Sequence, residues 1–246
     1  RWFDVCNGHD SRDPLSLPRV DGWEASLGTF PVRGLRVAIV RNFGGAIVSP
    51  AMWQKLEATA ERLVHWAGLS RVDAVNTSLP RMGAAWSISG MISIASALGD
   101  AWPACADELT PEIRFGIETT SGKYSADARA KIEERRVAVN NRMAEIFDEV
   151  DLIITASNPD VAFDADGPLP DTFGGISAGA GNNGLLTFPA NLYGNPAISV
   201  PSGDVDGLPI GLQIIGRHHS EQVLLELAHI IEREQPWPLI APTAPV

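Results

Sequence analysis

The stretch between residues 34 and 75 changes its hydrophobic period twice, and no other feature of the chain constrains the fold as strongly. Residues 34–40 form a short apolar run rich in β-branched side chains, which is typical of a buried strand. From Ser49 and Pro50 to Gly68, apolar residues then recur every three or four positions, as on one face of a helix, and a second short run follows at residues 72–75. A strand, a helix and a strand in succession predict a βαβ unit with parallel strands.

Helix-like and strand-like segments continue to alternate along the rest of the chain. We predict further helices over residues 80–98, 110–120, 125–149 and after Ser220, and further strands over residues 151–155, 196–200 and 208–215. Ser49, Ser125 and Ser220 stand where they can cap helices, and the turn-rich residues 202–207 predict a hairpin between the last two strands. The fold class that this order indicates is α/β, with a mixed, mostly parallel sheet flanked by helices.

Charge and hydropathy exclude several classes of partner. The net charge is −11 and no run of Lys and Arg occurs, so we expect no nucleic acid partner. No apolar run reaches the roughly 18 residues of a membrane span, so we expect no membrane partner either.

Two cysteines, Cys6 and Cys105, are too few for a disulfide framework, which favours free thiols in a reducing, cytoplasmic compartment. The five histidines have no metal-ligand spacing, and we expect no metal and no cofactor.

The first eight residues have the pattern of the last turns of a helix that Gly8 ends. Because the chain begins inside an element and without Met, we expect that a further segment precedes it.

About forty residues rich in Gly, Pro, Asn and Asp, numbers 156–195, separate two predicted strands. Ordered loops of that length are uncommon and tend to be functional, so we expect the site here.

Residues 175–179 match GxSxG, but the Pro-rich stretch before them cannot form the central strand that a nucleophilic Ser177 needs. Residues 179–184 match GxGxxG without a preceding strand, which indicates a flexible loop. His218 and His219 follow a predicted strand and either fill a corner, which we favour, or serve a pocket.

Five segments, taken in order, resemble the amidase-signature family. They are DVCNGHDSRDP (4–14), GLRVA (34–38), VDLIIT (150–155), LTFPANLYGNPAISVP (186–201) and GLPIGLQIIG (207–216). The last two are the most specific, because they keep both residue types and spacing across two strands and their loop. The resemblance runs from one end of the chain to the other and implies the C-terminal portion of an amidase-signature fold, with residues 1–246 as part of a single domain.

The resemblance also implies a hydrolase that splits carboxylic amides through an acyl-enzyme. In that family a serine nucleophile, a second serine in a cis peptide and a lysine do the chemistry, and all three lie in the N-terminal half. This chain has no segment of the Gly-Gly-Ser-Ser-Gly-Gly type. Its lysines, Lys55, Lys123 and Lys131, lie on or beside predicted helices, on the faces that carry charged residues. We therefore expect no catalytic residue in this chain.

The resemblance implies that the chain supplies walls of a substrate pocket. The residues we expect to bind substrate are Trp86, Asn183 and Thr187. Gly184 stands where family members place a polar or acidic residue that holds an amine, which favours an uncharged aliphatic or aromatic amide as substrate. The expected partners are this small-molecule amide and the N-terminal half of the same amidase. Apolar surface left by a missing half also allows a homo-oligomer. The alternative function is a non-catalytic partner or binding module that keeps the amidase scaffold.

Overall fold

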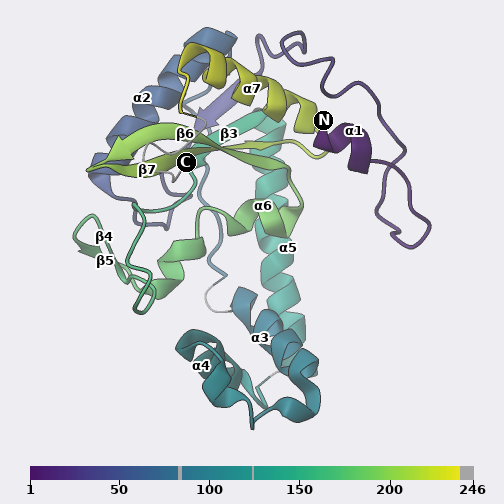
Figure 1. Cartoon of the computed structure of the whole chain (residues 1–246), viewed down its shortest axis with the longest axis vertical. Helices are drawn as coiled ribbons and strands as arrows, with labels where there is room; N and C mark the ends of the chain where they lie inside the picture. Colours follow the sequence, from purple (N-terminus) through teal and green to yellow (C-terminus); the bar gives the residue numbers. More distant parts are fainter. Residues whose placement is uncertain (83–84, 124, 239–246) are drawn as a thin grey trace, which may run out of the picture.

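The computed structural model describes residues 1–82, 85–123 and 125–238, and these residues are built around one five-stranded sheet (Figure 1). The strands are β1 (Arg36–Ile39), β2 (Ser70–Arg71), β3 (Leu152–Ala156), β6 (Ala197–Val205) and β7 (Leu208–Gly216). They lie in the order β2-β1-β3-β7-β6, and β7 alone runs against the other four. The mixed, mostly parallel sheet predicted from the sequence is therefore confirmed.

The βαβ unit begins with β1, continues through the helix α2 (Pro50–Ala67) and ends with β2, which pairs with β1 in parallel. Gly68 ends α2 in the left-handed conformation, with φ 62° and ψ 39°, which glycine adopts without strain. The second strand is Ser70–Arg71 and not residues 72–75, since only Val72 continues the pairing, through a hydrogen bond from its N–H to the Val37 carbonyl. Strand boundaries depend on such partners as much as on local composition.

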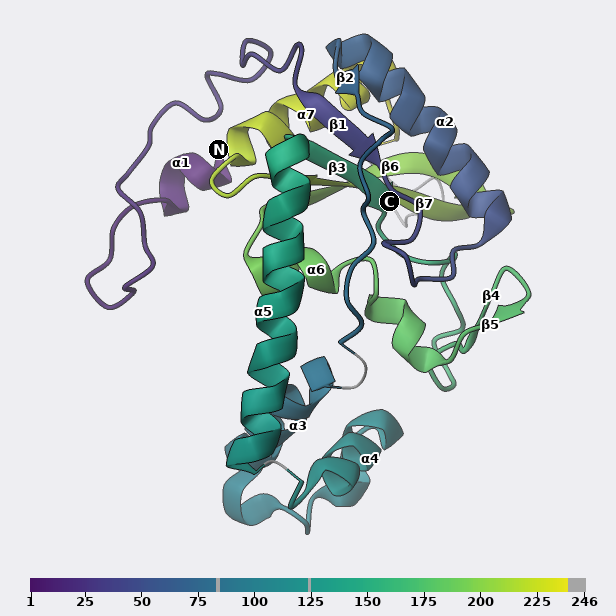
Figure 2. The ribbon, with the colours of Figure 1, turned by 180° about the vertical axis from the view of Figure 1, so that it is seen from behind.

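Two helices cover one face of the sheet. They are α2 and the C-terminal helix α7 (Glu221–Glu234), which contact each other as well as β6 and β7. The opposite face is covered by the C-terminal part of the long helix α5 (Ala126–Glu149) and by the short helix α6 (Phe188–Tyr193), as Figure 2 shows. All five residues of β3 are buried, because this central strand is enclosed by both layers.

The three serines proposed as caps behave differently. Ser125 caps α5 as expected, since its Oγ accepts a hydrogen bond from the Ala128 N–H at 3.1 Å. Ser49 and Ser220 precede α2 and α7 but make no side-chain cap, so those two expectations are wrong. The Ser220 hydroxyl instead donates to the Arg217 carbonyl at 2.6 Å, and Ser49 is held by its backbone N–H, which donates to the Pro159 carbonyl at 2.9 Å. A distant segment thus engages the Ser49 backbone, whereas the Ser220 hydroxyl bonds to the turn just before its helix.

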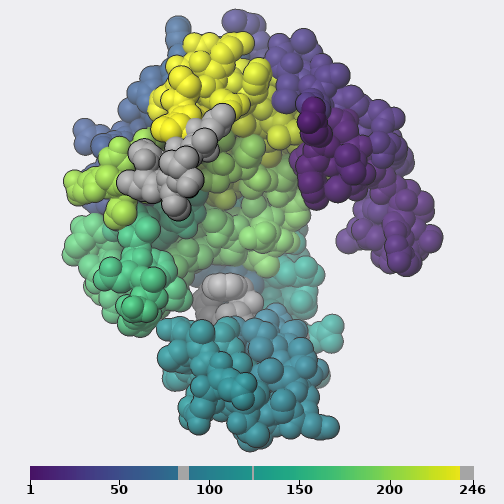
Figure 3. Space-filling model, in the orientation of Figure 1, coloured from purple at the N-terminus to yellow at the C-terminus, as the bar shows by residue number. Residues whose placement is uncertain are grey.

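A helical lobe, residues 85–123, stands away from the sheet (Figure 3). It contains α3 (Ala85–Leu98), the short 3-10 helices η1 (Gly99–Ala101) and η2 (Ala106–Glu108), and α4 (Pro111–Thr120). The N-terminal part of α5 reaches down to it from the sheet (Figures 1 and 2). Ile117 of α4 and Ile132 of α5 are buried, but both lie outside the hydrophobic core that surrounds the sheet. None of the residues 89–98 of α3 is buried.

The chain begins with the helix α1 (Trp2–Cys6) and then runs as an irregular segment along the outside of the molecule to β1 (Figure 1). The Asp4 carboxylate accepts hydrogen bonds from the backbone N–H groups of Trp23 and Glu24, and the Phe3 ring stacks on Trp23 with centroids 4.7 Å apart. The predicted helix is confirmed: it ends at Cys6, the extended Asn7 is its C-cap, and Gly8 follows with φ 138°.

Residues 156–195, predicted as a long loop, contain four short elements. A hairpin of β4 (Thr172–Phe173) and β5 (Ile176–Ser177) is followed by the 3-10 helix η3 (Ala180–Gly184) and by α6. The predicted hairpin of β6 and β7 is confirmed, with a bulge between Pro201 and Asp204. Within the part of the chain that the structure describes, no helix has the length and apolar character needed to cross a bilayer.

Candidate functional site

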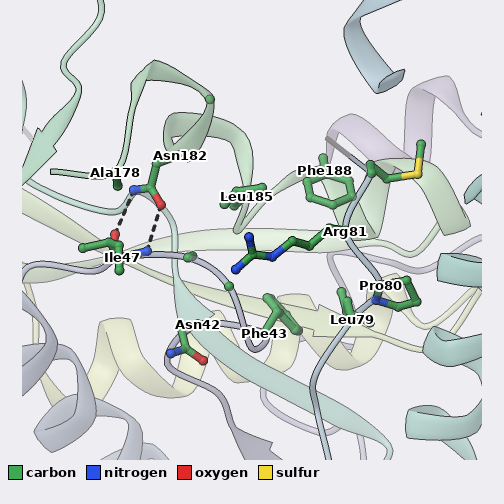
Figure 4. A pocket seen from close by; sticks show the side chains of 14 residues that line it. Asn42, Phe43, Ile47, Leu79, Pro80, Arg81, Ala178, Asn182, Leu185 and Phe188 are labelled. Atoms are coloured by element: carbon green, nitrogen blue, oxygen red, sulfur yellow. Dashed lines mark hydrogen bonds between the residues drawn. The ribbon is translucent and has the colours of Figure 1, made fainter. Parts of the chain in front are cut away.

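A cavity of about 540 Å³ lies at the carboxyl ends of the parallel strands β1 and β2 (Figure 4). Three segments distant in sequence form its wall: residues 42–47 after β1, residues 79–82 before α3, and residues 178–188 around η3. In open α/β sheets, ligands bind in the crevice at the carboxyl ends of the strands. This cavity is therefore the candidate site.

One buried amide ties the first and third segments together. Asn182 is 2% exposed, its Nδ2 donates to the Ile47 carbonyl at 2.8 Å, and its Oδ1 accepts from the Ile47 N–H at 2.8 Å (Figure 4). The Ile47 backbone thus engages both the oxygen and the nitrogen of this side chain, and the side chain is buried, so the amide positions the wall.

The turn after β1 is shaped by Asn42 and Gly44. The Asn42 carbonyl accepts from the N–H groups of Gly45 and Ala46, both at 2.9 Å, and its Oδ1 accepts from the Gly44 N–H at 3.0 Å. Gly44 has φ +80°, and a Cβ there would lie 2.7 Å from the Ser78 Oγ. A glycine is required at this position on both grounds. The first and second segments of the wall are joined beside this turn by a hydrogen bond of 2.9 Å from the Leu79 N–H to the Phe43 carbonyl.

The wall is mostly apolar. Its hydrophobic side chains come from all three segments and are those of Phe43, Ala46, Ile47, Leu79, Pro80, Met82, Ala178, Leu185 and Phe188. The polar side chains on it are Asn42, Arg81 and Asn182. Figure 4 shows the Arg81 guanidinium directed into the cavity between Leu185 and Phe43. An apolar pocket with few polar groups is the usual form of a small-molecule site.

The three residues predicted to bind substrate do not meet in this cavity. Asn183 lies on the wall of a second cavity of about 390 Å³, and its Nδ2 donates to the carbonyls of Pro170 and Ala180 at 2.9 and 2.8 Å. Thr187 lines neither cavity, and its hydroxyl points to the Gly184 carbonyl at 3.4 Å. Trp86 lies on α3, but its side chain is outside the described residues. Their role in substrate binding stays a prediction.

The serine, glycine and histidine motifs that the sequence analysis considered show no catalytic arrangement among the described residues. Ser177 belongs to the two-residue strand β5 on an exposed hairpin, and its hydroxyl has no hydrogen bond to any residue that the structure describes. The GxGxxG match is the 3-10 helix η3 and opens no α-helix. His218 lies at the surface, where its Nε2 is 2.7 Å from the Tyr193 carbonyl and its ring packs on Tyr193.

The lysines lie on the surface, as predicted. Lys131 pairs with Asp127 one helical turn away at 2.8 Å, Lys55 donates to the Asp204 carbonyl, and Lys123 is exposed in the turn after α4. Among residues 1–82, 85–123 and 125–238, no group of three or more His, Cys, Asp and Glu side chains gathers as metal ligands do.

A charge cluster lies at the opposite end of the parallel strands, where the central strand β3 begins. The Asp151 carboxylate accepts hydrogen bonds from the guanidinium groups of Arg36 and Arg217 and from the Arg36 backbone N–H, at 2.8 to 3.2 Å. Burial raises the pKa of Asp151, but these hydrogen bonds outweigh it, and the pKa lies below its usual value. The cluster joins β1, β3 and the end of β7, and its position makes it structural.

Sequence reasoning missed the polar residues of the cavity: Asn42, Arg81 and Asn182. Asn182 did lie within the long segment that was expected to hold the site, one residue from Asn183. Arg81 carried no local signal, because it lies at the start of the helix predicted over residues 80–98. Only the fold shows which of these side chains line the same cavity.

Comparison with known proteins gives a consistent result. Residues 1–225 match the family model described as Amidase. The A subunit of the glutamyl-tRNA(Gln) amidotransferase of Listeria monocytogenes serotype 4a is 30% identical over 261 residues, covering 94% of this chain and 52% of that protein. The corresponding protein of Synechococcus sp. strain RCC307 is 30% identical over 272 residues, covering 98% and 54%. The chain thus spans about half the length of the curated relatives it matches.

Solved structures of similar fold lead to the same family. A bacterial aryl acylamidase of the amidase-signature enzymes superposes with a TM-score of 0.77 at 25% identity, covering 95% of this chain and 50% of that one. The 6-aminohexanoate cyclic dimer hydrolase has a TM-score of 0.73 at 20% identity, covering 95% and 52%, and supports the fold alone.

Proposed function

The chain belongs to the amidase family, and from this premise we propose that it is the C-terminal portion of a longer amide hydrolase, in which it supplies walls of the substrate pocket. The reaction would convert a carboxylic amide to a carboxylate and ammonia or an amine. In this proposal residues 1–246 are part of one amidase-signature domain, and the N-terminal half of the same amidase is the partner that completes the site.

The observation that carries this proposal is the chemistry of the cavity wall. None of the described residues that line the 540 Å³ cavity is a serine, cysteine, lysine, histidine, aspartate or glutamate. The wall therefore offers shape, apolar surface and hydrogen-bond donors, but it has no side chain that can attack a carbonyl or take a proton from a nucleophile. Such a wall suits binding and leaves catalysis to another segment.

Amide hydrolysis needs parts that this wall lacks. A serine hydroxyl attacks only when a base takes its proton, and the oxyanion that forms needs preorganised N–H donors, each worth several kcal/mol. We assign these parts to the upstream segment, which would carry a serine nucleophile, a second serine in a cis peptide and a lysine. The apolar side chains Leu185 and Phe188 of the wall fit the body of an aliphatic or aromatic amide. The similarity to an aryl acylamidase supports an aryl amide among these.

A reconstitution assay tests the proposal. The 246-residue chain is assayed for ammonia release from simple aliphatic and aryl amides, alone and joined to the product of its upstream coding region. We expect turnover only from the joined protein. Robust hydrolysis by the chain alone would overturn the assignment of catalysis to another segment. An upstream region without a serine-rich and glycine-rich segment would instead favour the non-catalytic binding module.

A further inference from the structure

On the described wall, the side-chain groups without any hydrogen-bond partner are donors. Both ends of the Asn182 amide are engaged by Ile47, and the Asn42 Oδ1 is engaged by the Gly44 N–H. The Asn42 Nδ2 has no acceptor among the residues described, and the Arg81 guanidinium brings five N–H donors and no acceptor. A ligand that satisfies these groups must therefore present acceptors.

Arg81 is also an unpaired charge. It makes no hydrogen bond and no ion pair with any residue in the described ranges, and no aspartate or glutamate lies on the described cavity wall. Elsewhere in this chain of net charge −11, Arg36, Arg114 and Arg217 each pair with carboxylates. A guanidinium beside apolar surface is stabilised most by an anion that takes two of its parallel N–H donors.

We propose that this cavity binds the carboxylate of an anionic amide substrate through Arg81, with the Asn42 amide as a second donor. The apolar part of the same substrate lies against Leu185 and Phe188. The anion site rests on the cavity, and the statement that its occupant is a substrate rests on the proposed amide hydrolysis. The substrate class is an amide that carries one free carboxylate on an aryl or alkyl body, in place of the uncharged amide that Gly184 favoured.

The chemistry of the wall favours a carboxylate over a phosphate group. A carboxylate has one charge and two oxygens, which match the paired donors of a single guanidinium. A phosphate monoester carries up to two charges and three free oxygens, and it is normally held by several cations or by a row of backbone N–H groups. Arg81 is the only cation on the described wall, and apolar side chains surround it.

Binding is tested without any hydrolysis. Phenylacetate, and its neutral isostere phenylacetamide, are titrated into the 246-residue chain by calorimetry or by NMR at neutral pH. We expect phenylacetate to bind at least about tenfold more tightly than phenylacetamide, and R81Q to abolish that preference, while R81K retains part of it. The matched control is R135Q, which removes an exposed arginine of α5 that makes no hydrogen bond or ion pair within the described chain, and it should bind as the parent does.

Equal binding of the two probes, or a preference that survives R81Q, would overturn the carboxylate site. Circular dichroism excludes misfolding as the cause of a loss, and the exposed position of Arg81 makes such misfolding unexpected. Because no turnover is measured, this result is independent of whether the longer protein is an amidase.

The substrate assignment has its own test in the intact protein. The ratio of kcat/KM for a carboxylate-bearing aryl amide to kcat/KM for its neutral analogue should fall at least about tenfold in R81Q, mainly through KM. An unchanged ratio would show that Arg81 selects no substrate, even where the intact protein hydrolyses both amides.

Discussion

Asn182 and Ile47 exchange two hydrogen bonds of 2.8 Å each, from Asn182 Nδ2 to the Ile47 carbonyl and from the Ile47 N–H to Asn182 Oδ1. The two residues are 135 positions apart, and this reciprocal pair fixes the turn after β1 against η3. The amide is buried, so water cannot replace either bond without opening the wall.

Replacing Asn182 by Ala should lower the free energy of unfolding by about 2 kcal/mol, because it leaves the Ile47 N–H and carbonyl without their partner. Urea unfolding monitored by circular dichroism measures the change. Asn191→Ala is the control, since that exposed side chain makes a single 3.3 Å hydrogen bond to Thr187, and we expect a change below about 0.5 kcal/mol. Equal effects in the two variants would show that the pair does not hold the wall.

Gly174→Ala and Gly175→Ala should differ in their cost. Both glycines have positive φ, +54° and +81°, but only at Gly174 would a Cβ meet other atoms, the Pro50 Cδ at 2.7 Å and the Ser49 Cα at 2.9 Å. Conformational strain of about 1 kcal/mol is common to both, and the clash adds about 1 to 3 kcal/mol at Gly174. Thermal unfolding of the two variants compares them directly. A Gly175→Ala variant as unstable as Gly174→Ala would mean that contact with α2 is unimportant.

Asp151→Asn should destabilise the protein at pH 7 and much less at pH 3. The folded pKa of Asp151 lies below its usual value, so the ionised carboxylate stabilises the fold above about pH 4, and this contribution is lost as the pH falls through the lowered pKa. We expect a loss of about 1 to 2 kcal/mol at neutral pH, given the partial exposure of the cluster. Melting temperatures at both pH values provide the measurement.

Asp148→Asn is the control for that series. Asp148 is exposed on α5, and its carboxylate makes no hydrogen bond or ion pair with the residues of the described structure. Its melting temperature should follow that of the parent protein at both pH values. A pH-independent effect of Asp151→Asn would contradict the electrostatic origin of the stabilisation.

Ser177→Ala should leave unchanged the amide hydrolysis that we propose for the longer protein. The hydroxyl lies on an exposed two-residue strand and has no hydrogen bond to a base among the described side chains. Without a base its proton stays in place, and the serine is a poor nucleophile. Steady-state kinetics of the variant, with an aryl amide as substrate, is the measurement. Loss of turnover would establish Ser177 as the nucleophile and refute the interpretation of the GxSxG match as a surface hairpin.

The sequence alone determined the long helices and the main strands of the sheet, and their order along the chain. Residues 126–149 and 50–67 repeat apolar side chains at helical spacing, and the apolar runs that became β1, β3 and β7 are buried in the sheet. These features could be predicted because hydrophobic periodicity is a local property that the folded core enforces. The last two segments of the family resemblance became α6, β6 and β7, so the most specific residues also form the strand pair at the edge of the sheet.

Only the tertiary structure decided which polar side chains share a site. Asn182 and Asn183 are neighbours of the same residue type, yet Asn182 ties the wall of the larger cavity and Asn183 lines the smaller one. Ser49 precedes α2 without capping it, and its backbone N–H donates to the carbonyl of the distant Pro159. Arg81 faces the cavity because segments on either side of it, from β1 and from η3, meet there. Such outcomes depend on contacts between segments far apart in the chain, and no local pattern of residues encodes them.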